Sequence, residues 1–143
     1  MEQRISFLTL GVADLTRSKS FYEALGWTAS TYGAGAGVVF FQLNGMVLGL
    51  FPHGELASDA GLPPTVVTGF RGVTISHNTR SQVEADAVIG EALAAGGTLL
   101  KAGHRASWGG YVAYFADPDG HVWEVCHNPN ATIGADGSVR LPL

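Results

Sequence analysis

The order strand, helix, three strands occurs twice along this chain, and it constrains the fold more than any other feature. In the first copy the predicted strands are residues 4–10, 27–32, 38–43 and 46–51, and the predicted helix is 15–25. In the second copy, about 65 to 70 residues later, the strands are 71–77, 98–103, 111–116 and 121–127, and the helix is 82–95. One such unit cannot cover its own sheet. We therefore predict an α+β fold of two tandem βαβββ modules, whose curved mixed sheet surrounds a pocket.

Local signals support the two helices. Asp14 and Ser81 each offer a side-chain oxygen to the free N–H groups of a helix start, and Glu84 completes a capping box with Ser81. Gly26 and Gly96-Gly97 end the helices. Asn44-Gly45 predicts a tight hairpin turn.

We expect a single domain of 143 residues. Its parts would be module one at about 1–52, a proline-containing linker at 53–69, module two at about 70–128 and a C-terminal tail at 129–143. Asp136-Gly137 between short apolar pairs predicts a small hairpin in that tail.

Composition excludes several classes of protein. Hydrophobic residues make up 46% and charged residues 14% of the chain, which is too apolar for a disordered polymer. A net charge of −4 with only 8 Lys plus Arg argues against nucleic acid as a partner. The apolar stretches are too short for a membrane span, and no signal-peptide core is recognisable, so we expect a cytoplasmic protein. The lone cysteine, Cys126, is interpreted as a small apolar strand residue.

Two motifs carry a family resemblance. Residues 11–15, with Phe21-Tyr22 and Leu25-Gly26, resemble the opening of the vicinal oxygen chelate superfamily, which includes glyoxalase I, bleomycin-resistance and fosfomycin-resistance proteins and extradiol dioxygenases. Residues 114–125, reading YFADPDGHVWEV, resemble its closing hairpin. The continuation through residue 129 and the late DGSVRLP segment are similar to a small bacterial glyoxalase-like branch.

The resemblance implies a divalent metal held by His or Glu at four strand positions. In this chain the four positions fall on Phe7, Gly49, Gly72 and Glu124. Only Glu124 can bind a metal, so we expect no cofactor and no family metal site. The alternative is a divalent ion in a site rebuilt from histidines. Of these, His121 and His127 alternate away from Glu124, His53 and His77 lie at strand ends, and only His104 could turn toward the pocket.

The pocket lining is predicted from strand alternation and from the resemblance. The predicted ligand-binding residues are Phe7, Phe41, Phe51, Thr74, Trp108, Val112, Tyr114 and Glu124. The resemblance implies the inward orientation of Val112 and Tyr114. Aromatic residues on a concave sheet are also typical of a plain core, and that alternative stays open.

Two functions from different classes follow. The first is a metal-independent protein that binds a small aromatic or hydrophobic molecule, as the bleomycin-resistance branch does, within a homodimer. The second is a lyase, isomerase or dioxygenase-like enzyme that uses a rebuilt metal site, or Glu124 as general base with Tyr114 as acid. A purely structural or regulatory dimer would leave Glu124 without a role.

Overall fold

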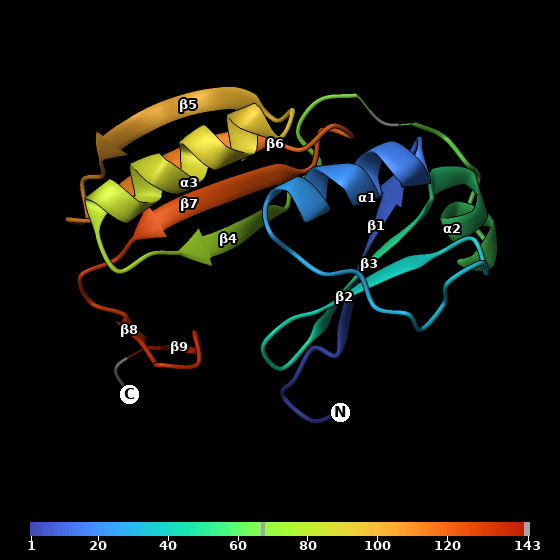
Figure 1. Ribbon diagram of the computed structural model, residues 1–143, viewed down its shortest axis with the longest axis horizontal. Helices are drawn as coiled ribbons and strands as arrows, with labels where there is room; N and C mark the ends of the chain where they lie inside the picture. The colour runs from blue at the N-terminus through green and yellow to red at the C-terminus, as the bar shows by residue number, and fades with distance from the viewer. Residues whose placement is uncertain (67, 142–143) are drawn as a thin grey trace. The chain divides into compact units, whose positions relative to one another are not determined.

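The computed structural model describes residues 1–66 and 68–141 (Figure 1). The chain divides into two compact units, Met1–Arg71 and Gly72–Leu143, and each is an α+β unit with a mixed sheet. Within the described residues, no helix has the length and apolar character that crossing a membrane requires. The predicted α+β class is confirmed.

The first unit contains a three-stranded sheet in the order β1-β3-β2. Its elements are β1 (Phe7–Val12), α1 (Leu15–Ala24), β2 (Val39–Gln42), β3 (Val47–Pro52) and α2 (His53–Asp59). Strand β3 pairs in parallel with β1 and antiparallel with β2. The predicted cap of α1 is confirmed, since the Asp14 side chain accepts a hydrogen bond from the Arg17 N–H at 2.9 Å.

The core of the first unit lies on the α1 side of this sheet. Alternate residues of β1 and β3 are buried there with side chains of α1 and β2, namely Leu10, Val12, Leu48, Leu50, Phe21, Tyr22 and Phe41. The opposite face of the sheet carries the residues between them, among them Phe7 and Gly49.

Two segments of the first unit differ from expectation. Residues 27–32 form only an isolated bridge, Ala29 to Phe41, because Trp27 turns into the core and packs 5.8 Å from the Phe41 ring. The stretch expected as a linker begins with α2, which follows Pro52 and carries Glu55 in its first turn, where an acidic side chain suits the helix dipole. The hairpin at Asn44-Gly45 is present, but only Gly45 has positive φ, at 80°.

The second unit contains a four-stranded sheet in the order β4-β7-β6-β5. Its elements are β4 (Thr74–Asn78), α3 (Gln82–Ala94), β5 (Thr98–Arg105), β6 (Tyr111–Ala116) and β7 (Val122–His127). The predicted cap by Ser81 is confirmed, since its hydroxyl accepts from the Glu84 N–H at 3.1 Å, while the Glu84 carboxylate accepts from the N–H of Arg80, one residue before the N-cap, at 2.7 Å. The predicted strand, helix and three strands therefore all occur here.

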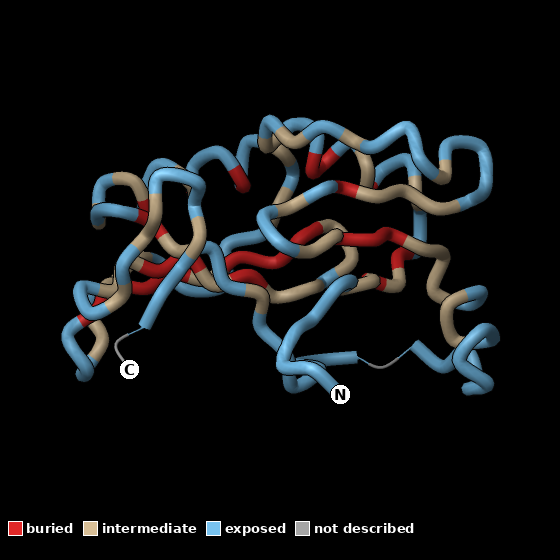
Figure 2. Tube along the Cα trace, turned by 90° about the horizontal axis from the view of Figure 1, so that it is seen from below, coloured by how far each residue is buried: buried red, intermediate tan, exposed pale blue. Residues whose placement is uncertain are grey.

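Helix α3 covers one face of this sheet (Figure 1). Its buried residues Ala85, Ile89 and Ala92 lie over the sheet side chains Ala113, Phe115, Trp123 and Val125. Figure 2 marks the buried positions along the chain in red. The predicted tail hairpin is confirmed as β8 (Thr132–Ile133) and β9 (Val139–Arg140), and Arg80 donates a 2.9 Å hydrogen bond to the carbonyl of Gly134 beside it. The candidate site lies on the other face of this sheet, away from α3.

Candidate functional site

One cross-strand row of the second sheet brings three polar residues together. Ser76 of β4 is the register partner of Glu124 of β7, and Glu124 is the register partner of Tyr114 of β6. Residues directly opposite one another in a sheet point to the same face. Because Phe115 and Trp123 occupy the α3 face, this row lies on the other one.

The three side chains form a hydrogen-bonded group around the carboxylate. The Ser76 hydroxyl donates to Oε1 of Glu124 at 3.0 Å, and the Tyr114 hydroxyl donates to Oε2 at 2.7 Å. The hydrogen bond to Glu124, followed by burial and by the carboxylate charge, raises the pKa of Tyr114 to about 12. At neutral pH the Tyr114 hydroxyl is therefore protonated, and its hydrogen is donated to Glu124.

The neighbouring rows of this face are mostly apolar or uncharged. Thr74 is opposite Val122, and Val112 is opposite Cys126. Cys126 is buried, and burial, followed by the Glu124 charge, raises the pKa of its thiol. A neutral buried thiol agrees with the interpretation of Cys126 as a small apolar residue and not as a nucleophile.

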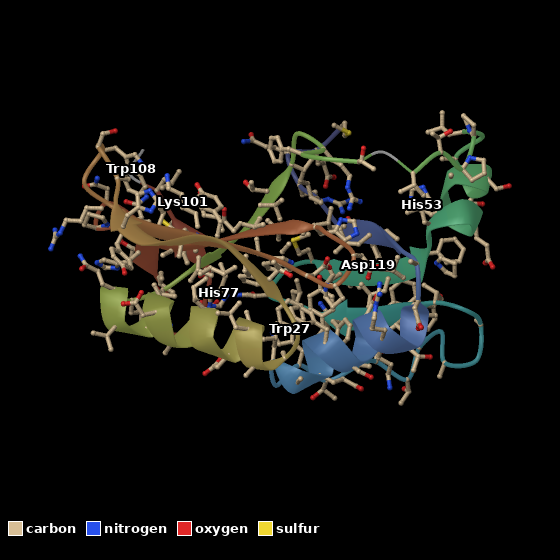
Figure 3. The ribbon with its side chains drawn as sticks, turned by 90° about the horizontal axis from the view of Figure 1, so that it is seen from above. Trp27, His53, His77, Lys101, Trp108 and Asp119 are labelled. Atoms are coloured by element: carbon tan, nitrogen blue, oxygen red, sulfur yellow. The ribbon has the colours of Figure 1, made fainter. Side chains whose placement is uncertain are left out.

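Strand β5 extends this face at the edge of the sheet. Lys101 is the register partner of Tyr114, and His104 is the register partner of Val112. The pairing of β5 with β6 shifts between Leu99 and Lys101 and again between Lys101 and His104. Figure 3 shows Lys101 and Trp108 on the side of the sheet away from α3. The Trp108 side chain folds over Gly110, where it leaves no room for a Cβ, and it stays 50% exposed.

Phe7 and Phe51 lie on the face of the first sheet opposite its core. Phe7 is 54% exposed and meets the Phe40 ring edge to face, with centroids 5.9 Å apart. Phe41, expected on this face, lies instead in the core, since it pairs with the buried Leu48 and packs 5.7 Å from the Tyr22 ring. Strand alternation puts Phe40 on the open face in its place. Phe40 was not among the predicted residues, because its pairing with Gly49 cannot be recognised in the sequence.

Comparison with known proteins identifies the family. A sequence profile of the Glyoxalase/Bleomycin resistance protein/Dioxygenase superfamily matches residues 4–125. The chain belongs to this superfamily. The resemblance predicted from the two motifs is thereby confirmed.

Solved structures of this superfamily share the fold. A glyoxalase-related enzyme from Fulvimarina pelagi is 36% identical over 99% of this chain and 100% of its own, with a TM-score of 0.88. A glyoxalase/bleomycin resistance protein/dioxygenase from Nocardioides is 26% identical over 89% and 84%, with a TM-score of 0.74. A lactoylglutathione lyase from Agrobacterium tumefaciens, at 24% identity, 90% and 96% coverage and a TM-score of 0.67, supports the fold alone. No curated protein sequence matches the chain.

At three of the four positions where the resemblance implies metal ligands, the residues are Phe7, Gly49 and Gly72, whose side chains have no atom that can bind a metal. Phe7 is opposite Val47, and Gly49 is opposite Thr9. Gly72 lies before β4, with a φ of 76°, and the β4 residue opposite Glu124 is Ser76.

The histidines do not supply the missing ligands around Glu124. His77 lies on the α3 side of the sheet (Figure 3), opposite Val125. Nδ1 of His127 lies 3.2 Å from the carbonyl of Thr79, and Nδ1 of His104 lies 3.1 Å from that of Ala102. In the first unit, His53 begins α2. In residues 1–66 and 68–141, no three His, Cys, Asp or Glu side chains are grouped so that they could hold a metal ion.

Proposed function

We propose that this superfamily member binds a small aromatic or hydrophobic molecule without a metal ion, on the open face of its second sheet. One observation carries the proposal: both oxygens of the single family carboxylate, Glu124, accept hydrogen bonds from protein hydroxyls, those of Ser76 and Tyr114. Thr74, Trp108 and Val112 complete the proposed ligand contacts in this unit.

The chemistry of this group suits binding. An ionised carboxylate has about four acceptor positions, so Glu124 keeps two after bonding Ser76 and Tyr114. The two hydroxyls hold the carboxylate in one orientation, which lowers the entropy cost of presenting it to a ligand. The rings of Tyr114 and Trp108 supply apolar area, typical of sites in which a few polar groups orient an apolar ligand.

The 2.7 Å contact between Glu124 and Tyr114 also allows a second candidate, an isomerase or lyase with Glu124 as base and Tyr114 as acid. A general acid works best when its pKa is near the operating pH. The raised pKa of Tyr114, about 12, opposes that role. Binding is therefore the better supported function.

The test is thermal denaturation of the untagged protein against a panel of planar aromatic compounds, with and without EDTA. A ligand at a hundred times its Kd should stabilise the fold by about 2.7 kcal/mol, and EDTA should leave that gain unchanged. Tyr114→Phe should weaken binding. The matched control is Tyr111→Phe, because Tyr111 donates to Asp86 of α3 at the same 2.7 Å but on the covered face of the sheet. Stabilisation that EDTA abolishes, or one metal ion per chain lost in Glu124→Gln, would refute the proposal.

We further propose that the two units form a single cooperative domain and that the protein is a cytoplasmic homodimer without a nucleic-acid partner. The superfamily profile spans both units, and the net charge of −4 disfavours binding to phosphates. Light scattering of the purified protein measures the mass in solution, and coincident denaturation curves from fluorescence and circular dichroism test cooperativity. A monomeric mass or two separate transitions would contradict these expectations.

A further inference from the structure

We propose that the ligand of this face carries an anionic group at one end and an O–H or N–H donor at the other, held between Lys101 and Glu124. The inference rests on the proposed binding function and names the class of molecule bound. It follows from the polarity of one row of the sheet, Ser76–Glu124–Tyr114–Lys101.

One end of this row can only accept hydrogen bonds from a ligand. Ser76 and Tyr114 both direct their hydroxyl hydrogens to Glu124. The raised pKa of Tyr114 keeps its proton in place across the physiological range. The oxygen atoms of these three residues can therefore only accept further hydrogen bonds. A ligand that binds them must supply an O–H or N–H donor.

The other end of the row is positive. Lys101 is separated from Glu124 by one intervening strand, so their Cα atoms lie about 10 Å apart, two strand spacings. The Lys101 side chain is exposed and forms no ion pair with the described residues, whereas Lys19, the other lysine, pairs with Glu23 at 3.0 Å. If the donor of a single-ring ligand binds Glu124, an anionic group at the opposite end of the ring can reach the ammonium group of Lys101.

The backbone around Lys101 supports a specific placement. The two register shifts that flank Lys101 are irregularities of the kind that re-aim a side chain, and such irregularities are over-represented beside active sites. Trp108 lies on the same side of the sheet (Figure 3) and offers an indole surface to a ring. A lysine on an edge strand also blocks pairing with other strands, and a residue with that role alone would not affect ligand affinity.

Three probes that share one ring test the inference by titration calorimetry. They are 4-hydroxyphenylacetate, which carries both groups, 4-methylphenol, which lacks the anion, and tyramine, which replaces the anion with a cation. We expect 4-hydroxyphenylacetate to bind about fivefold more tightly than 4-methylphenol, and tyramine to bind least tightly. Added salt should reduce the advantage of the anion.

Substitutions test whether Lys101 causes the tighter binding of the anionic probe. Lys101→Met should remove the advantage of 4-hydroxyphenylacetate and leave the affinity for 4-methylphenol unchanged, while the control Lys19→Met should change neither. Equal affinities for the three probes, or no effect of Lys101→Met, would overturn this inference and leave the binding function standing. If none of the three probes binds while other aromatic compounds in the panel do, the ligand class is wrong. If the whole panel fails, the proposed function falls with it.

Discussion

Replacing Tyr114 by Phe removes one hydroxyl and tests whether the group around Glu124 exists in solution. Hydrogen bonds to charged groups contribute about 1.5 to 3 kcal/mol when buried. Tyr114 and Glu124 are only part-buried, and water can replace the lost donor. We therefore expect Tyr114→Phe to lower the free energy of unfolding by about 1 kcal/mol, or about 4 °C in Tm for a chain of this size.

The pH dependence of that difference follows from the raised pKa of Tyr114. A tyrosine whose pKa rises from 10.0 to about 12 on folding stabilises the native state through its protonated form. The contribution is fully present below pH 10 and is lost as the pH rises toward 12. The stability gap between the native protein and Tyr114→Phe should therefore be constant from pH 7 to 9 and narrow as the pH rises above 10.

Two measurements check the result. Urea denaturation followed by tryptophan fluorescence gives the stability gap at each pH. Tyrosinate absorbance gives the titration directly, because the difference between the native protein and Tyr114→Phe should be one tyrosine with a pKa of about 12. A difference spectrum that titrates near 10.0, the ordinary tyrosine value, would refute the hydrogen bond from Tyr114 to Glu124.

Three further outcomes test the fold and its chemistry. Ser81→Ala should lower the free energy of unfolding, measured by urea denaturation, by about 1 kcal/mol, because the hydrogen bond from the Glu84 N–H to the Ser81 hydroxyl is lost. Ser81→Asp should retain most of that stability. Alanine should have opposite effects at two glycines: Gly90→Ala in α3, where a Cβ meets nothing within 4 Å, should stabilise by about 1 kcal/mol, and Gly26→Ala at a φ of 86° should destabilise by about 1 kcal/mol. Cys126 should react with a thiol reagent only after denaturant is added, and fast reaction of the native protein would contradict its burial.

The sequence predicts most of the second unit because its local signals and its packing agree. Ser81 and Glu84 mark the start of α3, and the Asp117-to-Gly120 turn places β6 and β7 side by side. Residues 122–127 alternate so that Glu124 is separated from Trp123 and Val125, which need the cover of α3. That alternation alone predicts the face of Glu124.

The pairing between strands, in contrast, cannot be predicted from local sequence patterns. Residues 38–41 are all apolar, so alternation cannot decide whether Phe40 or Phe41 faces the core, and only the pairing with Leu48 and Gly49 settles it. The irregular register of β5 likewise hides the position of Lys101 opposite Tyr114. Which β4 residue lies opposite Glu124 also depends on the register, because β4 begins only at Thr74 and its pairing with β7 puts Ser76 there.

The two units differ in what surrounds the positions where the resemblance implies metal ligands. In the first unit Gly49 lies against its neighbours so closely that a Cβ would stand 3.0 Å from Oγ1 of Thr9 and 3.3 Å from the Phe40 ring. A carboxylate at position 49 would therefore have to displace an aromatic ring that Phe7 and Tyr32 also contact. In the second unit Glu124 is present, and each of its two oxygens accepts one hydrogen bond from a hydroxyl, that of Ser76 or that of Tyr114. The positions where the resemblance implies metal ligands are thus surrounded by close aromatic packing in the first unit and by hydroxyl hydrogen bonds in the second.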